Sequence, residues 1–174
     1  RKRCGALRRR SIENLAEAGD AEAQFLLAAA YRNRDASDKD RAHVKRLYLL
    51  SADQAFPPAM HNYATLRHSE YRSQAQAFRY RNREVLDLPN DEGPPDYADS
   101  VIWYQKAALL GHAKSMKVLG SMYRSGKGVK IDMEKSVKWY RKSAELGYPK
   151  AMNALAIMYR SNRYVSADFA ESLR

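Results

Sequence analysis

The sequence has little cysteine and no long apolar run, and both absences narrow the class of protein. Cys4 is the only cysteine among 174 residues, which excludes an internal disulfide framework and a cysteine-rich zinc site. No apolar stretch approaches the roughly 18 residues that would cross a bilayer. Acidic residues are scarce relative to basic ones, 20 against 31, which gives a net charge of +11. The composition therefore predicts a basic globular protein without a membrane span.

Residue patterns that carry catalysis or metal binding are also lacking. The four histidines, at positions 43, 61, 68 and 112, form no i, i+4 pair and have no cluster of carboxylates beside them. Gly126-Lys127-Gly128 follows a helical segment and does not end in Ser or Thr, unlike a phosphate-binding loop. Cys4 has no histidine near it in the sequence. We predict that the chain is not an enzyme and holds no cofactor or metal.

The basic charge gathers at the start of the chain. Residues 1–10 hold six Lys and Arg residues and no acid, so they contribute +6 of the +11. Such a start is typical of a transit-peptide remnant, of a basic arm that contacts nucleic acid, or of a solvated helix start. The chain opens with Arg1 rather than Met, so we expect a fragment or a processed form. We expect a soluble protein of the cytoplasm or an organelle such as the mitochondrion, rather than a secreted one.

An internal repeat of 36 residues organises the chain. The segment 111–123 aligns with 147–159, and the segment 19–31 aligns with 55–67, both at an offset of 36. Between the second and third copies the offset is 56, which leaves an insertion of 20. The same spacings relate Asp40, Asp96, Asp132 and Asp168, and also Tyr48, Tyr104 and Tyr140. This register predicts a tandem array of one structural unit.

Each unit is predicted to form two helices. Residues 113–124 carry one apolar stripe at helical period. Residues 132–146 begin with Asp132, suited to an N-cap, and are followed by Gly147, suited to a left-handed C-cap. We expect all six prolines to lie between helices, and no stretch alternates as a strand does. Small residues share one column where neighbouring helices meet: Ala28, Ala64, Gly120 and Ala156.

The unit at residues 113–147 has a distinctive pattern. Its positions are Ala113, Leu119, Gly120, Tyr123, Gly126, Gly128, Val129, Asp132, Lys135, Ser136, Trp139, Tyr140, Lys142, Ser143, Ala144, Glu145 and Gly147. This pattern resembles the Sel-1-like repeat, a relative of the tetratricopeptide repeat. The match is good over residues 96–111 and 151–159 and weaker over 19–55 and in the second unit. The resemblance implies an all-α fold, a right-handed α-solenoid of helix-turn-helix pairs, and a role as a non-catalytic adaptor in multiprotein assemblies.

The register predicts that residues 1–174 form a single repeat domain. It consists of a basic arm (1–6), a half repeat (7–19), repeat one (20–55), repeat two with a 20-residue insertion (56–111), repeat three (112–147) and a truncated repeat four (148–174). Both outer units are incomplete, whereas isolated repeat arrays need polar caps. We therefore expect further repeats or a partner at both ends of the solenoid.

The first helices of related solenoids line a concave groove, and the resemblance implies the same arrangement here. Positions off the apolar stripe fall into three columns, and the third is nearly all basic, which would favour an acidic segment of a partner protein. The expected groove residues are Phe25, Arg32, His61, His68, Lys117, Ser121, Arg124, Asn153, Ile157 and Arg160. The competing interpretation is that these side chains are merely solvated or cover apolar area with their stems.

The insertion, roughly residues 68–87, has apolar residues at helical spacing, which predicts that it extends or adds a helix. Over residues 78–83 aromatic and arginine side chains alternate, as in segments that contact RNA. The alternative function is therefore a basic structural subunit of a ribonucleoprotein such as an organellar ribosome. Its RNA contacts would be Arg1, Lys2, Arg3, Arg79, Tyr80, Arg81 and Arg83. An amphipathic helix packed on the solenoid is the competing interpretation of this run.

Overall fold

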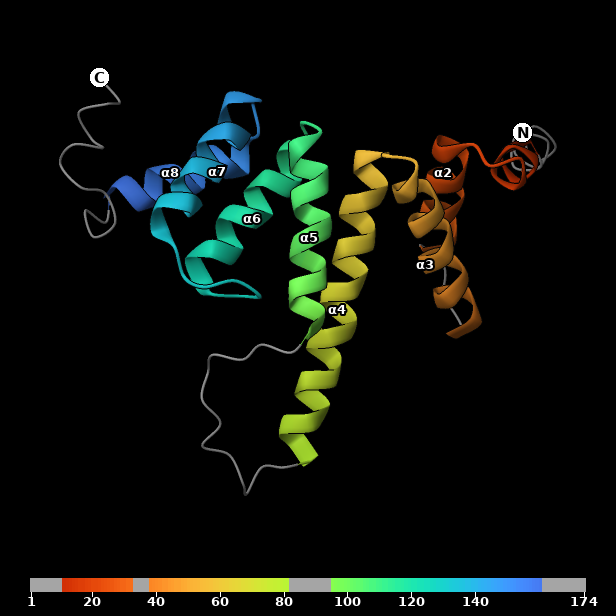
Figure 1. Cartoon of the computed structure of the whole chain (residues 1–174), viewed down its shortest axis with the longest axis horizontal. Coiled ribbons are helices and arrows are strands. Elements are labelled where there is room, and N and C mark those ends of the chain that lie inside the picture. Colours follow the sequence, from red (N-terminus) through yellow and green to blue (C-terminus); the bar gives the residue numbers. More distant parts are fainter. Residues whose placement is uncertain (1–10, 33–37, 82–94, 161–174) are drawn as a thin grey trace.

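The computed structural model describes residues 11–32, 38–81 and 95–160, and every regular element in these ranges is helical. A short helical segment at 11–17 comes first. It is followed by α2 (Ala21–Arg32), α3 (Asp38–Asp53), α4 (Pro57–Arg81), α5 (Pro95–Leu109), α6 (Ala113–Ser125), α7 (Met133–Glu145) and α8 (Pro149–Arg160). The helices follow one another along the long axis, so α2 and α8 lie at opposite ends (Figure 1). The predicted all-α solenoid is confirmed.

The helices pack as the repeat predicts. Helices α2 and α3 contact each other, as do α4 and α5, and α6 and α7. Successive pairs are joined by contacts of α3 with α4, α5 with α6, and α7 with α8. Helices α4 and α5 run side by side in opposite directions (Figure 1). Each of the helices α3 to α7 thus packs against its partner and against a neighbouring pair, which is how a repeat array builds a continuous core.

The helix ends follow from capping residues. Asp132 caps α7, because its Oδ1 accepts the Lys135 backbone N–H at 2.8 Å. Asp40 and Asp96 lie within the first turns of α3 and α5 rather than ahead of them, and Asp168 lies outside the described residues. The prediction that all prolines lie between helices is wrong for four prolines in first turns: Pro57 and Pro58 begin α4, Pro95 begins α5 and Pro149 begins α8. Proline is tolerated there, since the first helical N–H has no partner within the helix.

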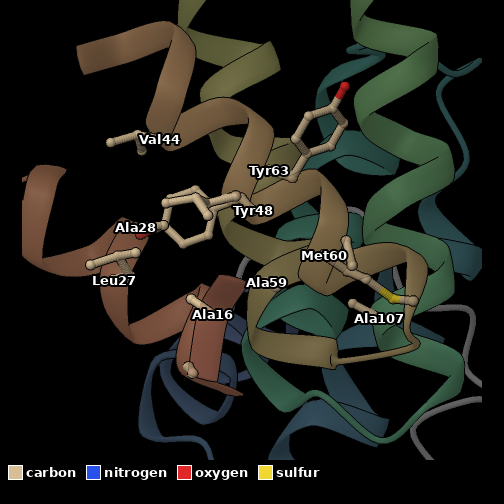
Figure 2. Close-up of a cluster of buried hydrophobic side chains, with 12 residues drawn as sticks. Ala16, Leu27, Ala28, Val44, Tyr48, Ala59, Met60, Tyr63 and Ala107 are labelled. Atoms are coloured by element: carbon tan, nitrogen blue, oxygen red, sulfur yellow. The ribbon is translucent and has the colours of Figure 1, made fainter. Parts of the chain in front are cut away.

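The core consists of three clusters of buried side chains, one for each junction of helix pairs. Tyr48, Tyr104 and Tyr140 are 0%, 3% and 1% exposed, so the tyrosine column is confirmed as a packing column. Figure 2 draws the first cluster, in which the ring of Tyr48 from α3 points toward Ala28 of α2.

The column of small residues is buried at Ala28, Ala64 and Gly120, as the sequence predicts. Ala156 of α8 is exposed, because within the described residues only α7 makes extensive contact with α8.

The two tryptophans occupy equivalent, half-buried positions on the second helices. Trp103 joins two of the core clusters, and Trp139 packs against one of them. The ammonium group of Lys106 lies 4.3 Å from the Trp103 ring centroid, and that of Lys142 lies 5.2 Å from the Trp139 ring centroid. Each ring therefore has a cation on its outer side and the core on its inner side.

The insertion lengthens the first helix of repeat two. Helix α4 spans 25 residues and continues through Arg81, which confirms the prediction that the insertion extends a helix. Residues 82–94 lie outside the described part of the chain.

Candidate binding surface

The first helices of the four repeats, α2, α4, α6 and α8, each present one stripe of residues spaced i, i+3, i+7 and i+10. At 3.6 residues per turn these positions share one face of a helix. The stripes are Glu22, Phe25, Ala29 and Arg32 on α2; Pro58, His61, Thr65 and His68 on α4; Lys114, Lys117, Ser121 and Arg124 on α6; and Lys150, Asn153, Ile157 and Arg160 on α8. We call them together the first-helix surface. Its first half, on α2 and α4, and its second half, on α6 and α8, differ in burial and charge.

In the first half, Phe25 belongs to the core rather than to an open face. Its ring centroid lies 5.9 Å from that of Tyr48 and 5.4 Å from that of Phe56, and the side chain packs against the first buried cluster. Arg32, at the end of the same helix, is exposed. The structure therefore leaves Arg32, and not Phe25, available on α2.

His61 is also buried, with only 4% of its surface exposed. Its Nδ1 lies 2.9 Å from Ser115 Oγ, and the same hydroxyl lies 2.9 Å from Nδ1 of His112. The sequence placed His61 on an open groove, but in the structure this side chain links α4 to the start of α6. It does not line an accessible surface.

The proton positions in this chain of three groups follow from one backbone contact. The Ser115 N–H donates to His112 Nδ1 at 3.3 Å, so that nitrogen carries no proton. The Ser115 hydroxyl can then donate to His112, and His61 Nδ1–H donates to Ser115 Oγ. Burial, together with smaller contributions from His112, Lys114 and Arg32, lowers the pKa of His61 to about 3. Both imidazoles are neutral near pH 7, since burial and then Lys114 lower the pKa of His112 as well.

The serine between two histidines does not form a nucleophilic site. Ser115 is fully buried, so no substrate reaches its hydroxyl. Within the described residues, no group of three or more His, Cys, Asp and Glu side chains is placed to hold a metal ion. The arrangement instead satisfies the polar atoms of a buried helix junction.

The remaining stripe residues of α4 also make contacts within the molecule. The Thr65 hydroxyl donates to the His61 carbonyl at 2.8 Å and lies 3.0 Å from the Tyr104 hydroxyl. His68 meets the Tyr97 ring edge-on, with a centroid distance of 4.7 Å. The stripe of α4 is therefore used largely for packing.

The second half of the first-helix surface is open and strongly basic. Helices α6 and α8 carry five Lys and Arg residues and no acidic residue. Four of the five are exposed, namely Lys114, Arg124, Lys150 and Arg160, and Lys117 is half-buried. Burial, followed by repulsion from Lys150 and Arg124, lowers the pKa of Lys117. Lys117 of α6 therefore senses the positive charge of Lys150 on α8 as well as that of Arg124 on its own helix.

Uncharged side chains fill the rest of this half. Ile157 is 54% exposed, Asn153 is exposed and Ser121 is half-buried. The stripe thus offers positive charge beside an aliphatic side chain, which suits a partner with acidic and apolar residues. Lys114 and Lys150 were not among the predicted groove residues, although the register could have found them: they are 36 residues apart, three positions before Lys117 and Asn153.

The segments considered for RNA contact are described only in part. Arg1, Lys2, Arg3 and Arg83 lie outside the described residues. Arg79, Tyr80 and Arg81 lie at the end of α4, where the structure describes the helical backbone and not the side chains.

The glycine loop that superficially suggested phosphate binding is a turn between α6 and α7. Gly126 is the left-handed C-cap of α6, with a φ of 70°. Gly128, with a φ of 69°, lies so near the backbone of Tyr97 that a Cβ would stand 2.7 Å from its carbonyl carbon. Gly126 therefore ends the helix, and Gly128 lets the turn pack against the start of α5.

The repeated helix pairs and the largely accessible second half of the first-helix surface define the class of protein, a helical-repeat solenoid. The Sel1 repeat model matches residues 21–56, 90–112, 113–148 and 149–174. The chain therefore belongs to the Sel1 repeat family, as its sequence pattern predicted.

Solved structures give the same fold. The chain is similar to c5321, a protective antigen present in uropathogenic Escherichia coli strains, with 32% identity and a TM-score of 0.65 over 88% of this chain. It spans 29% of that protein's length. It is also similar to a Sel1 repeat protein from Oxalobacter formigenes, with 25% identity and a TM-score of 0.62 over 84% of this chain and 95% of the other. No curated protein matches the chain.

Family membership carries a coarse statement about function. Sel1 repeat proteins generally mediate protein–protein interactions and are typically non-catalytic scaffolds. Among the described residues, no helix has the length and apolar character needed to span a membrane.

Proposed function

We propose that this protein is a non-catalytic scaffold that binds a segment of a partner protein along its first-helix surface, within a larger assembly. The observation that carries the proposal is the contrast between the two halves of that surface. Most stripe residues of α2 and α4 are used for internal packing, whereas α6 and α8 present charged, polar and aliphatic side chains to solvent. Exposed charged, polar and aliphatic side chains on one face add little to the stability of the fold, but such a mixture is typical of a protein interface.

The proposed contact residues follow from this contrast. They are Arg32, Lys117, Ser121, Arg124, Asn153, Ile157 and Arg160, together with Lys114 and Lys150. Phe25, His61 and His68 were also predicted for the groove, and they are left out because their side chains pack against other side chains of the molecule.

Site-specific photo-crosslinking tests the proposal. A benzoylphenylalanine crosslinker in place of the exposed Asn153 lies on the stripe of α8, and the same crosslinker in place of the exposed Lys138 lies on α7. We expect defined protein adducts from position 153 and none from the control position when each variant is expressed in its native cells. Equal adducts at both positions, or RNA as the main adduct at 153, would contradict the proposal.

A second candidate function is a structural subunit of a ribonucleoprotein, and the net charge of +11 favours it. The six basic residues among the first ten, together with Arg79, Arg81 and Arg83, would contact phosphate groups. RNA crosslinking of the full chain, compared with a variant that lacks residues 1–6 and carries glutamate at these three arginines, tests this candidate. RNA adducts that disappear in the variant support it, and adducts that persist contradict it.

A further inference from the structure

We infer that Lys114, Lys117 and Lys150 form an anchor for the carboxylates of an acidic segment in the partner protein. We call these three residues the lysine anchor. The inference rests on the proposed function and specifies the chemistry of the partner.

The lysine anchor is built by the repeat itself. Lys114 and Lys150 are the second residues of α6 and α8 and occupy equivalent positions in successive repeats. Lys117 follows Lys114 by three residues, which places both on one face of α6. Repulsion by Lys150 reaches Lys117 across the two helices. The stripes of α6 and α8 thus both begin with a lysine, and Lys117 adds a third positive charge to the same end of the first-helix surface.

This arrangement is unfavourable for the protein alone. Lys114 and Lys150 lie in first turns, where the helix dipole disfavours positive charge, and neither α6 nor α8 has an acid in its first turn. Lys117 is half-buried, and burial disfavours its charged form.

No described residue forms an ion pair with any of the three lysines. The described ion pairs lie elsewhere and include Lys45 with Glu70, Arg67 with Asp99, and Lys135 with Asp132. A bound carboxylate would relieve the repulsion and interact favourably with both helix N-termini.

The surroundings favour an acidic protein segment over RNA. Single-stranded RNA binds to protein by stacking its bases on accessible aromatic rings. The aromatic residues of α6 and α8 are Tyr123 and Tyr159, and both are half-buried. The Tyr123 hydroxyl accepts from Gln105 at 3.3 Å, and the Lys135 ammonium lies 5.6 Å from its ring centroid. The exposed apolar residue on the stripe is the aliphatic Ile157, which matches leucine or isoleucine side chains of a partner.

Fluorescence anisotropy with a defined probe tests the lysine anchor. The probe is a fluorescein-labelled 15-residue peptide of Glu-Glu-Leu repeats, titrated with the full chain at low ionic strength. A Lys-Lys-Leu peptide and a mixed-sequence 15-nucleotide RNA are the comparison ligands. The test variant is Lys117→Glu with Lys150→Glu. The matched control is Lys127→Glu with Lys138→Glu, which changes the net charge equally at exposed lysines outside the stripes.

We expect the acidic peptide to bind and the Lys-Lys-Leu peptide not to bind. The test variant should raise the Kd of the acidic peptide about tenfold, and the control variant less than about twofold. Circular dichroism melting verifies that each variant is folded. If the charge reversal at Lys117 prevents folding, the variant Lys117→Gln with Lys150→Gln removes both positive charges without adding negative ones, and it should also raise the Kd.

Three outcomes would overturn the inference. In the first, the acidic peptide fails to bind. In the second, the test and control variants reduce the affinity for the acidic peptide equally. In the third, the RNA binds more tightly than the peptide, and its affinity falls only in the test variant. The crosslinking result separates this failure from failure of the proposed function. Protein adducts at position 153 without binding of the acidic peptide would leave a scaffold whose partner is not acidic.

Discussion

Gly120 of α6 lies directly against the ring of Tyr140 on α7, and a Cβ at Gly120 would stand 2.9 Å from Cδ1 of the tyrosine. The ring is 1% exposed and held within its cluster, so it has little room to move. Repeats one and two hold alanine at the equivalent positions, Ala28 and Ala64. In repeat three the glycine therefore permits a closer approach of the two helices than alanine would.

The variant Gly120→Ala should lose stability for this reason. Overpacking of a buried contact costs about 1–3 kcal/mol in the free energy of unfolding. The gain in helix propensity, about 1 kcal/mol, offsets part of this cost, so we expect a net loss of up to about 2 kcal/mol. Urea unfolding of the purified protein measures the change. Ser121→Ala, next along the same helix and half-buried, is the matched control and should unfold near the wild-type midpoint. A stabilised Gly120→Ala variant would show that α6 and α7 have room to separate.

A hydroxyl contact recurs between the two helices of a repeat. The Ser143 hydroxyl donates to the Ala113 carbonyl at 2.6 Å, and the Ser51 hydroxyl donates to the Ala21 carbonyl at the same distance. Repeat two has the fully buried Ala107 at this position. The contact therefore stabilises a repeat without being required for the fold.

Ser143→Ala should accordingly cost about 0.5–1.5 kcal/mol, the net contribution of one hydrogen bond. Ser125→Ala removes a hydroxyl that donates to the Ser121 carbonyl at an exposed helix end, and it should have no measurable effect. Differential scanning calorimetry of both variants provides the measurement. An equal loss in the two variants would show that the buried contact of Ser143 contributes no more to stability than the exposed contact of Ser125.

The repeat register predicted the helix pairs, the buried tyrosine column and the cap at Asp132, because these depend on local spacing. It did not predict the burial of His61, whose neighbours Ser115 and His112 are more than 50 residues away in sequence. Helical periodicity defines the face on which a side chain lies, but not which neighbouring helix covers that face. The lysine anchor was predicted only at Lys117, because the predicted groove columns began three residues after Lys114 and Lys150.

The junction between His61 and Ser115 should make stability depend on pH. Burial lowers the pKa of His61 from 6.5 to about 3 in the folded state. Between these values the unfolded chain binds the proton more readily, so the stabilisation is complete above pH 6.5 and is lost as the pH falls toward 3. The free energy of unfolding should fall by up to about 1.4 kcal/mol per pH unit in this range.

Urea unfolding at several pH values measures this dependence. The variant His61→Phe, which introduces the residue found at the equivalent position 25, removes the titrating group and should flatten the profile. His43→Phe, at an exposed position, should keep the wild-type slope. A wild-type slope in His61→Phe would assign the pH dependence to other groups.

Deletion of residues 1–6 should separate contacts with protein from contacts with RNA. This segment holds three basic residues and no acid, and it is not part of the proposed first-helix surface. The deletion should therefore leave the affinity for the Glu-Glu-Leu peptide within about twofold of the wild type, because weak electrostatic effects of distant charges are screened by salt. Affinity for mixed-sequence RNA should fall instead. Each phosphate contact that is lost should reduce the slope of log affinity against log salt by about 0.7 for a single strand. Titration of both ligands over a salt series gives the two slopes. If the deletion reduces the affinity for the peptide as much as the affinity for RNA, the acidic segment contacts the basic arm rather than α6 and α8.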